Sequence, residues 1–106
     1  MADEELLKKL KERDIMAAIV GPDGVQVASN FNISEGVDSY SASAFNVGDA
    51  LLREVGEAAK ELMISTDRGN LVLRKVDSGI LVSLIKNKDQ YTFYKGLLGL
   101  SGPKGA

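Results

Sequence analysis

The chain has 106 residues, of which 44% are hydrophobic and 26% are charged, and its formal net charge at pH 7 is −2. The near balance of charge disfavours nucleic-acid binding, because no basic field would attract phosphates. The sequence has neither Cys nor His, so it lacks the usual thiolate nucleophile, the commonest metal ligand and the commonest general base. We therefore expect no catalytic residue, no metal and no cofactor.

The length favours one domain with a real core, expected over residues 1–100, followed by a flexible tail over 101–106. A short amphipathic helix is predicted over residues 3–13, where leucines share one face and acidic residues precede basic ones. The charges at this end leave no apolar core for a signal peptide, and no run in the chain approaches the roughly 20 residues of a membrane span. We expect a cytoplasmic protein that does not insert into a membrane.

A β-hairpin is predicted next. The apolar run 15–20 ends at the sequence GPDG, which is typical of a tight turn, and the alternating run 25–29 indicates a strand with one covered face. A phosphate-binding loop is disfavoured at GPDG, because no Lys-Ser/Thr pair follows and the next segment is a strand. Residues 30–40 contain several turn formers, so a surface loop is expected there.

The chain is organised around an amphipathic helix predicted over residues 41–56. Its apolar arc spans roughly 160°, where a helix on one core surface needs only about 100°. The arc holds Ala44, Phe45, Val47, Gly48, Leu51, Leu52 and Val55. Such a helix has two contacts to satisfy, its own sheet and a second surface. The small residues Ala44 and Gly48 would let another backbone approach closely, or let the helix lie close to its own sheet.

Two ends are compatible with this helix. Gly56 is a typical helix stop, whereas residues 57–61 are helix formers that would extend the helix to Leu62. The candidate N-terminal caps are Asp38, Ser39 and Ser41.

Three further strands are predicted over residues 62–66, 70–76 and 80–85, and a last helix over 89–100. In that last helix the residues expected to be buried are Phe93, Leu97 and Leu100. Three of the five strands are apolar at almost every position, which is typical of a sheet covered on both faces.

The element order α-β-β-α-β-β-β-α indicates an α+β fold. We place the central helix on one face of a five-stranded sheet and the two terminal helices on the other. Strands 25–29 and 62–66 should form the edges, because neither has a full two-sided apolar pattern.

Three stretches resemble the Roadblock/dynein light chain family of small dimeric scaffolds, which also includes bacterial and archaeal GTPase regulators. In order they are LKERDIMAAIVGPDGVQVAS, SASAFNVGDALLREVG and ELMISTDRGNLVLRKVDSGILVSLI. The resemblance implies a five-stranded antiparallel sheet of the Roadblock/profilin-like kind and favours Gly56 as the helix end. It also implies dimerisation through the central helix and the short third strand, and control or scaffolding of small Ras-like GTPases.

Candidate site residues follow from this resemblance and from the wide apolar arc. The residues expected at a dimer interface are Val47, Leu51, Met63, Ile64, Ser65 and Thr66. The residues expected to meet a GTPase are Ala44, Phe45 and Gly48. The sequence does not support an arginine finger acting in trans, since nothing in the spacing distinguishes Arg53, Arg68 or Arg74 from an ordinary solvated arginine.

The sequence thus favours a non-enzymatic homodimeric scaffold or regulator that binds a small Ras-like GTPase. The alternative is a small-molecule sensor domain, because a sheet covered on both faces can hold a ligand under one layer, although the convergent polar groups of such a pocket are not evident. An enzyme without His or Cys would need another nucleophile and base, and no such pair is visible.

Overall fold

The computed structural model describes residues 3–21, 23, 25–31 and 37–99, so the predicted tail over 101–106 and Leu100 lie outside the described residues. The described elements follow one another in the predicted order. The helices are α1 (Asp3–Lys11), α2 (Val37–Arg53) and α3 (Lys88–Leu97), and the strands are β1 (Met16–Val20), β2 (Gln26–Ser29), β3 (Glu61–Thr66), β4 (Gly69–Val76) and β5 (Gly79–Ile85). The strand boundaries differ from the predicted ones by one residue.

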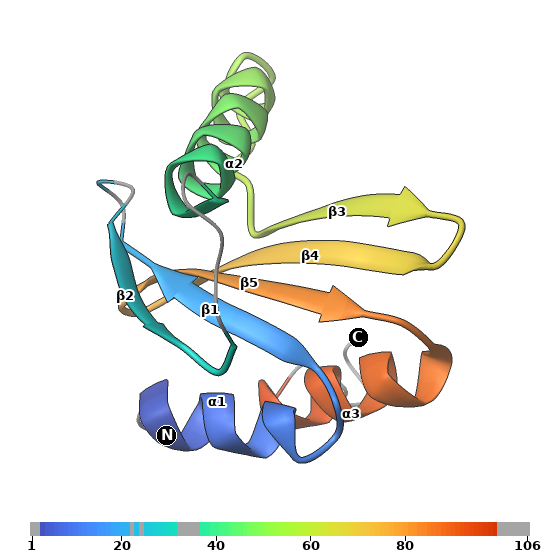
Figure 1. The fold of residues 1–106 in the computed structure, drawn as a ribbon. Coiled ribbons are helices and arrows are strands. Elements are labelled where there is room, and N and C mark those ends of the chain that lie inside the picture. Colours follow the sequence, from blue (N-terminus) through green and yellow to red (C-terminus); the bar gives the residue numbers. More distant parts are fainter. Residues whose placement is uncertain (1–2, 22, 24, 32–36, 100–106) are drawn as a thin grey trace.

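The five strands form one antiparallel sheet in the order β2-β1-β5-β4-β3. β2 and β3 therefore lie at the edges, as their patterns predicted. α2 lies over one face of the sheet, and α1 and α3 lie under the other (Figure 1). The predicted fold class is confirmed.

The side chains of the central strands alternate between two apolar layers. The larger cluster lies between the sheet and helices α1 and α3, and contains Leu6, Leu7, Leu10, Ile15, Ala17, Ile19, Val72, Leu81, Ile85 and Tyr94. The smaller cluster lies on the α2 side, and contains Val20, Ala42, Phe45, Ala59, Leu73, Ile80 and Val82. Among the α2 residues whose burial is described, Ala42 and Phe45 are the buried members of this cluster, and both lie in the first half of the helix. The helix is therefore anchored through its first half.

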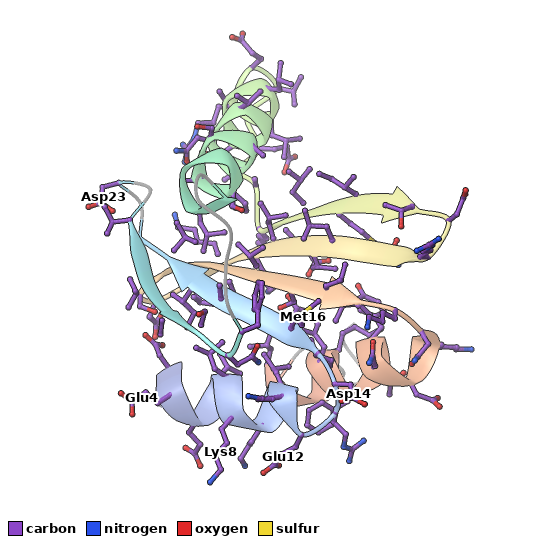
Figure 2. The ribbon with its side chains drawn as sticks, in the orientation of Figure 1. Glu4, Lys8, Glu12, Asp14, Met16 and Asp23 are labelled. Atoms are coloured by element: carbon purple, nitrogen blue, oxygen red, sulfur yellow. The ribbon has the colours of Figure 1, made fainter. Side chains whose placement is uncertain are left out.

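α1 ends two residues earlier than predicted, at Lys11. Asp14 has a φ of 60°, and its N–H and that of Ile15 donate to the carbonyls of Lys11 and Leu10 at 3.0 Å each. These two bonds close the helix end and turn the chain into β1. The polar side chains of Glu4, Lys8 and Glu12 point away from the sheet (Figure 2).

α2 begins at Val37, so the prediction of a surface loop is wrong over residues 37–40. Asp and Ser, which favour turns, are also compatible with the first turn of a helix. The helix ends at Arg53, and the alternative end at Leu62 is wrong. Gly56 has a φ of 78°, its N–H donates to the carbonyl of Arg53, and the N–H of Glu57 donates to Leu52. Glycine adopts this left-handed conformation without steric cost, which makes Gly56 an effective stop.

α3 begins after Asn87, whose side chain accepts the backbone N–H of Gln90 at 2.8 Å. The buried residue of this helix is Tyr94, which the sequence analysis missed, whereas Phe93 and Leu97 are only partly buried. Tyr94 lies one position after Phe93, so the face that α3 turns to the sheet is rotated by about 100° from the predicted one.

Candidate protein-protein interface

One face of α2 is apolar and exposed. This face carries Val47 and Leu51 of the helix and Val55, two residues after its end at Arg53, at four-residue intervals. The exposed fractions of these three residues are 61%, 67% and 73%. Phe45, in contrast, is 4% exposed and packs on the sheet. Phe45 and Val47 lie about 200° apart around the helix, so they face opposite sides. The later turns of α2 also stand away from the sheet, because the helix is inclined to it (Figure 1). We call Val47, Leu51 and Val55 the apolar stripe of α2.

β3 is the second exposed apolar element. Met63 and Ile64 are 39% and 45% exposed, and Ser65 and Thr66 are exposed as well. Among the described strands, β3 pairs only with β4 and is the last strand of the sheet. Its other side therefore presents backbone N–H and C=O groups that another strand can bind.

The residues predicted for the dimer interface all lie on these two elements, and all are exposed. Of the residues predicted to meet a GTPase, Ala44 is partly buried against the smaller core cluster. Phe45 is buried in that cluster, which corrects the expectation that its side chain faces a partner. It falls on the sheet-facing part of the apolar arc, whereas the stripe falls on the outer part.

Gly48 does not bring α2 close to its own sheet. A Cβ atom added at this position would meet no other atom within 4 Å. The alternative that Gly48 serves packing within the domain is therefore wrong. The space beside Gly48 is open and lies next to the stripe, about 60° around the helix from Leu51.

Asp49 joins α2 to the segment that leads into β3. Its Oδ1 accepts the backbone N–H of Ala59 at 2.7 Å, and its Oδ2 accepts the Nε–H of Arg53 at 2.8 Å. The bond from Ala59 and then the guanidinium of Arg53 lower the pKa of Asp49 below its ordinary value. The four-residue spacing to Arg53 is visible in the sequence, but the bond to Ala59 depends on the path of the chain after the helix.

A polar cluster holds the first residue of β3 on the opposite face. Oε1 of Glu61 lies 3.3 Å from Nη1 of Arg74, and the hydroxyl of Tyr91 donates to Oε2 of Glu61 at 3.5 Å. Burial, followed by the charge of Glu61, raises the pKa of Tyr91. Arg74 and Arg53 are thus both engaged in ion pairs within the chain, which leaves less reason to consider either as an arginine finger.

A cavity of about 370 Å³ lies between α2 and the turn that joins β4 to β5. It is lined by Phe45, Asn46, Asp49, Lys75, Val76, Asp77, Ser78, Gly79 and Ile80. This volume is near the lower end of the range for small-molecule sites, roughly 300–1,000 Å³. Asp49 already accepts hydrogen bonds from Ala59 and Arg53, and the other polar side chains of the lining are those of Asn46, Lys75, Asp77 and Ser78.

Within the described ranges, no three acidic side chains come together as metal ligands would. No helix in these ranges combines the length and the apolar character needed to cross a membrane.

No protein-family model and no curated protein sequence matches this chain. Solved structures match it over most of its length. A Roadblock/LC7 domain from Streptomyces avermitilis superposes with a TM-score of 0.70 at 12% sequence identity, and the match covers 93% of each chain. The chain has the Roadblock/LC7 fold.

Two MglB structures share this Roadblock/LC7 fold. One is described as MglB with a tetrameric arrangement, with a TM-score of 0.69, 17% identity, and coverage of 88% of this chain and 79% of the other. The second is the gliding protein MglB from Thermus thermophilus, with a TM-score of 0.65, 17% identity, and coverage of 90% and 84%. At these identities the likeness concerns the fold, which is the one that the sequence resemblance implied.

Proposed function

We propose that this protein is a non-enzymatic homodimeric scaffold or regulator that binds a small Ras-like GTPase. The observation that carries the proposal is the apolar stripe of α2 together with the open edge of β3. Covering apolar surface stabilises an assembly by about 25 cal/mol per Å², and contiguous exposed apolar surface is uncommon on proteins that remain monomeric. Both exposed elements are therefore interaction surfaces in this proposal.

A second copy of the chain fits these two elements. An open strand edge is satisfied by another strand, and two copies of one strand pair antiparallel about a two-fold axis. The apolar stripe carries no charge, and Glu61 is the only charged residue of β3, so such a pairing brings few like charges together. The tetrameric arrangement described for one MglB structure supports self-association of a chain with this fold.

The GTPase part of the proposal rests on the resemblance to the Roadblock/dynein light chain family, which includes GTPase regulators. Ala44 and Gly48 are the residues proposed to meet the GTPase. Open space beside Gly48 supports this position, since a partner can approach the helix backbone there. Phe45 lies outside the proposed surface, because its side chain is buried.

The experiment measures self-association and GTPase binding separately. Light scattering at micromolar concentration should give the mass of a dimer, and affinity capture of the tagged dimer from its native cell should recover a small GTPase, identified by mass spectrometry. A monomer would contradict the homodimer, and a dimer that captures no GTPase would contradict the partner.

Gly48→Arg locates the contact, with Ala50→Arg as the matched control. Ala50 is exposed on the polar side of the same helix, so both variants place an arginine in α2. We expect Gly48→Arg to remain folded and dimeric and to lose GTPase binding, because the added side chain occupies space that the partner needs. Ala50→Arg should bind normally. Equal binding by both variants would place the GTPase on another surface.

The cavity beside α2 favours a second candidate function, that of a small-molecule sensor domain. A ligand in this cavity would raise the melting temperature by mass action. Thermal unfolding in the presence of pooled metabolites measures this effect, and Asn46→Trp, which places a bulky side chain at the cavity wall, should abolish it. A melting temperature that no pool raises would remove this candidate.

A further inference from the structure

Along β3, the backbone N–H and C=O groups of successive residues point alternately toward β4 and toward the open edge of the sheet. Lys75 donates its N–H to the carbonyl of Lys60 at 3.1 Å. These two residues continue the β3–β4 register, in which Glu61 lies opposite Arg74. Alternate residues of an antiparallel strand bond to the same neighbour. Every second residue from Lys60 onward therefore directs its backbone groups toward β4.

The residues in between direct their N–H and C=O groups toward the open edge. These are Glu61, Met63 and Ser65. A partner strand that satisfied all three would complete the edge.

Two copies of β3 related by a two-fold axis can pair in only a few registers. Residues directly opposite each other have their side chains on the same face of the sheet. The two-fold axis therefore passes midway between one residue and the same residue of the other copy, and we call this residue the one on the axis. The residues near the middle of the strand that can lie on the axis are Leu62, Met63 and Ile64. Of these, only Met63 has backbone groups that face the open edge.

We propose that two copies of this chain join through β3 with the two-fold axis at Met63. This inference rests on the proposed homodimer and specifies its geometry. Met63 then faces Met63 of the partner subunit, and Glu61 faces Ser65 of the partner subunit. In this register each of the three outward-facing residues meets another outward-facing residue, so every N–H and C=O group of the edge is paired. The axis at Leu62 or Ile64 would leave one outward-facing residue of each strand outside the paired segment.

The side chains on the α2 face favour the same register. Two apolar rows cross the sheet on this face and end at β3. One row is Ile64, Leu71, Leu84 and Met16, and the other is Leu62, Leu73, Val82 and Ala18. Met16, at the far end of the first row, is labelled in Figure 2. With the axis at Met63, Ile64 lies opposite Leu62 of the partner subunit. Each row is then continued by an apolar row of the other copy.

The alternative registers place unlike side chains together. With the axis at Ile64, Leu62 would meet Thr66 of the partner subunit, and Glu61 would meet Asp67 of the partner subunit, which places like charges opposite each other. With the axis at Leu62, Ile64 would meet Lys60 of the partner subunit. Side-chain pairing and backbone pairing therefore select the same axis.

Disulfide cross-linking tests the register, because the chain contains no cysteine and each variant carries a single thiol. Residues opposite each other in a hydrogen-bonded pair have Cα atoms about 5.5 Å apart, within the disulfide range of about 4.4–6.8 Å. Met63→Cys should therefore form a covalent dimer under mild oxidation. Two copies of Ile64→Cys would be diagonal neighbours, roughly 7–8 Å apart, and should cross-link at least about tenfold more slowly.

A mixture of Leu62→Cys and Ile64→Cys provides the complementary measurement. These positions lie opposite each other at about 4.5 Å in the proposed register, so the mixture should form covalent heterodimers faster than either variant alone forms homodimers. Asp67→Cys, in the exposed turn between β3 and β4, reports the rate of random collisions. Non-reducing gels give the rates, and light scattering under reducing conditions gives the assembly state of each variant.

The outcomes separate this inference from the proposed function. A dimer in which Ile64→Cys or Leu62→Cys alone cross-links as fast as Met63→Cys would move the axis to that residue and overturn the register. A dimer in which no β3 variant cross-links faster than Asp67→Cys would overturn the β3 seam and leave the homodimer intact. A monomer under reducing conditions would contradict the homodimer itself.

Discussion

Asp49 accepts a hydrogen bond from the backbone N–H of Ala59 at 2.7 Å. Asp49 belongs to the part of α2 that stands away from the sheet, and Ala59 is buried in the smaller core cluster just before β3. The bond therefore joins the exposed half of the helix to the segment that leads into the edge strand. It restricts how the apolar stripe and the open edge are placed relative to each other.

The first prediction concerns the pH dependence of this link. The folded-state pKa of Asp49 is lowered from 3.8, chiefly by the bond from Ala59 and next by Arg53. A lowered carboxyl pKa adds stability that is fully present above the unfolded-state pKa and is lost as the pH falls through the folded-state pKa. Asp49→Asn keeps an acceptor for Ala59 and removes the charge. The stability difference between the wild type and Asp49→Asn should therefore be largest near neutral pH and shrink below about pH 4.

Urea unfolding at fixed protein concentration between pH 3 and pH 7 measures this difference. Asp23→Asn serves as a control, because Asp23 is an exposed carboxylate whose one hydrogen bond among the described residues is from the nearby N–H of Val25. A difference for Asp49→Asn that stays constant over the whole range would show that ionised Asp49 contributes nothing to the link.

The second prediction concerns the apolar stripe. Leu51→Asp should leave the monomer folded, since Leu51 is exposed in the single chain and exposed substitutions usually change stability by within about 0.5 kcal/mol. Burial of one leucine from each subunit contributes about 1.5–3 kcal/mol per side chain, so loss of both should weaken the dimer by about 100-fold or more. Analytical ultracentrifugation measures the dissociation constant.

Ala50→Asp is the control for this substitution. It introduces the same charge one residue away, on the polar side of α2. The control should dimerise as the wild type does. If Leu51→Asp also keeps the wild-type dissociation constant, the stripe lies outside the dimer interface.

The amphipathic pattern of α2 allowed most of this surface to be predicted from the sequence. An apolar arc of roughly 160° exceeds what one sheet covers, and the structure divides it into a buried part with Phe45 and an exposed part with Leu51. The width of the arc can be read from the sequence, but the rotation of the helix about its axis and its inclination to the sheet cannot, and these decide which part of the arc is buried. For that reason the sequence pattern alone places Phe45 in the wrong part.

Asn30 shows a second limit of prediction from the sequence. Its residue type indicates a turn, but its Oδ1 accepts the N–H of Ala17 at 2.9 Å, and its Nδ2 donates to the carbonyls of Leu7 at 2.9 Å and Ile15 at 3.1 Å. These bonds join the end of β2 to β1 and α1. The partners are backbone groups far away in the sequence, so no local pattern of side chains indicates them.

The third prediction concerns Tyr94, which is fully buried beneath the sheet. Its hydroxyl has no hydrogen-bond partner among the described residues, and burial raises its pKa. A buried unsatisfied hydroxyl costs about 1–3 kcal/mol, so Tyr94→Phe should keep or raise the free energy of unfolding. Tyr94→Ala should lower it by about 3–5 kcal/mol, because it leaves a cavity in the core.

Urea unfolding measures both variants of Tyr94. The ring of Tyr94 stacks on Tyr91 at a centroid distance of 6.1 Å, and phenylalanine retains this contact. A loss of more than about 1 kcal/mol in Tyr94→Phe would mean that the hydroxyl has a partner, since that is the typical worth of one hydrogen bond.

The fourth prediction compares proline at two neighbouring positions of β3. The N–H of Met63 faces the open edge, so Met63→Pro removes no bond within the monomer, and edge strands accept proline where the N–H faces outward. Ile64 lies opposite Leu71 and directs its N–H toward β4, so Ile64→Pro removes a bond of the β3–β4 ladder. Met63→Pro should yield a folded monomer, and Ile64→Pro should unfold or aggregate.

Circular dichroism and light scattering distinguish these states, with Leu51→Asp as the reference for a folded monomer. Met63→Pro should melt within a few degrees of Leu51→Asp, because both variants disrupt association and leave the domain intact. If Met63→Pro is dimeric with the wild-type dissociation constant, the edge of β3 takes no part in the interface. If it unfolds as Ile64→Pro does, its N–H is used within the monomer, and the alternation from which the register follows would be wrong.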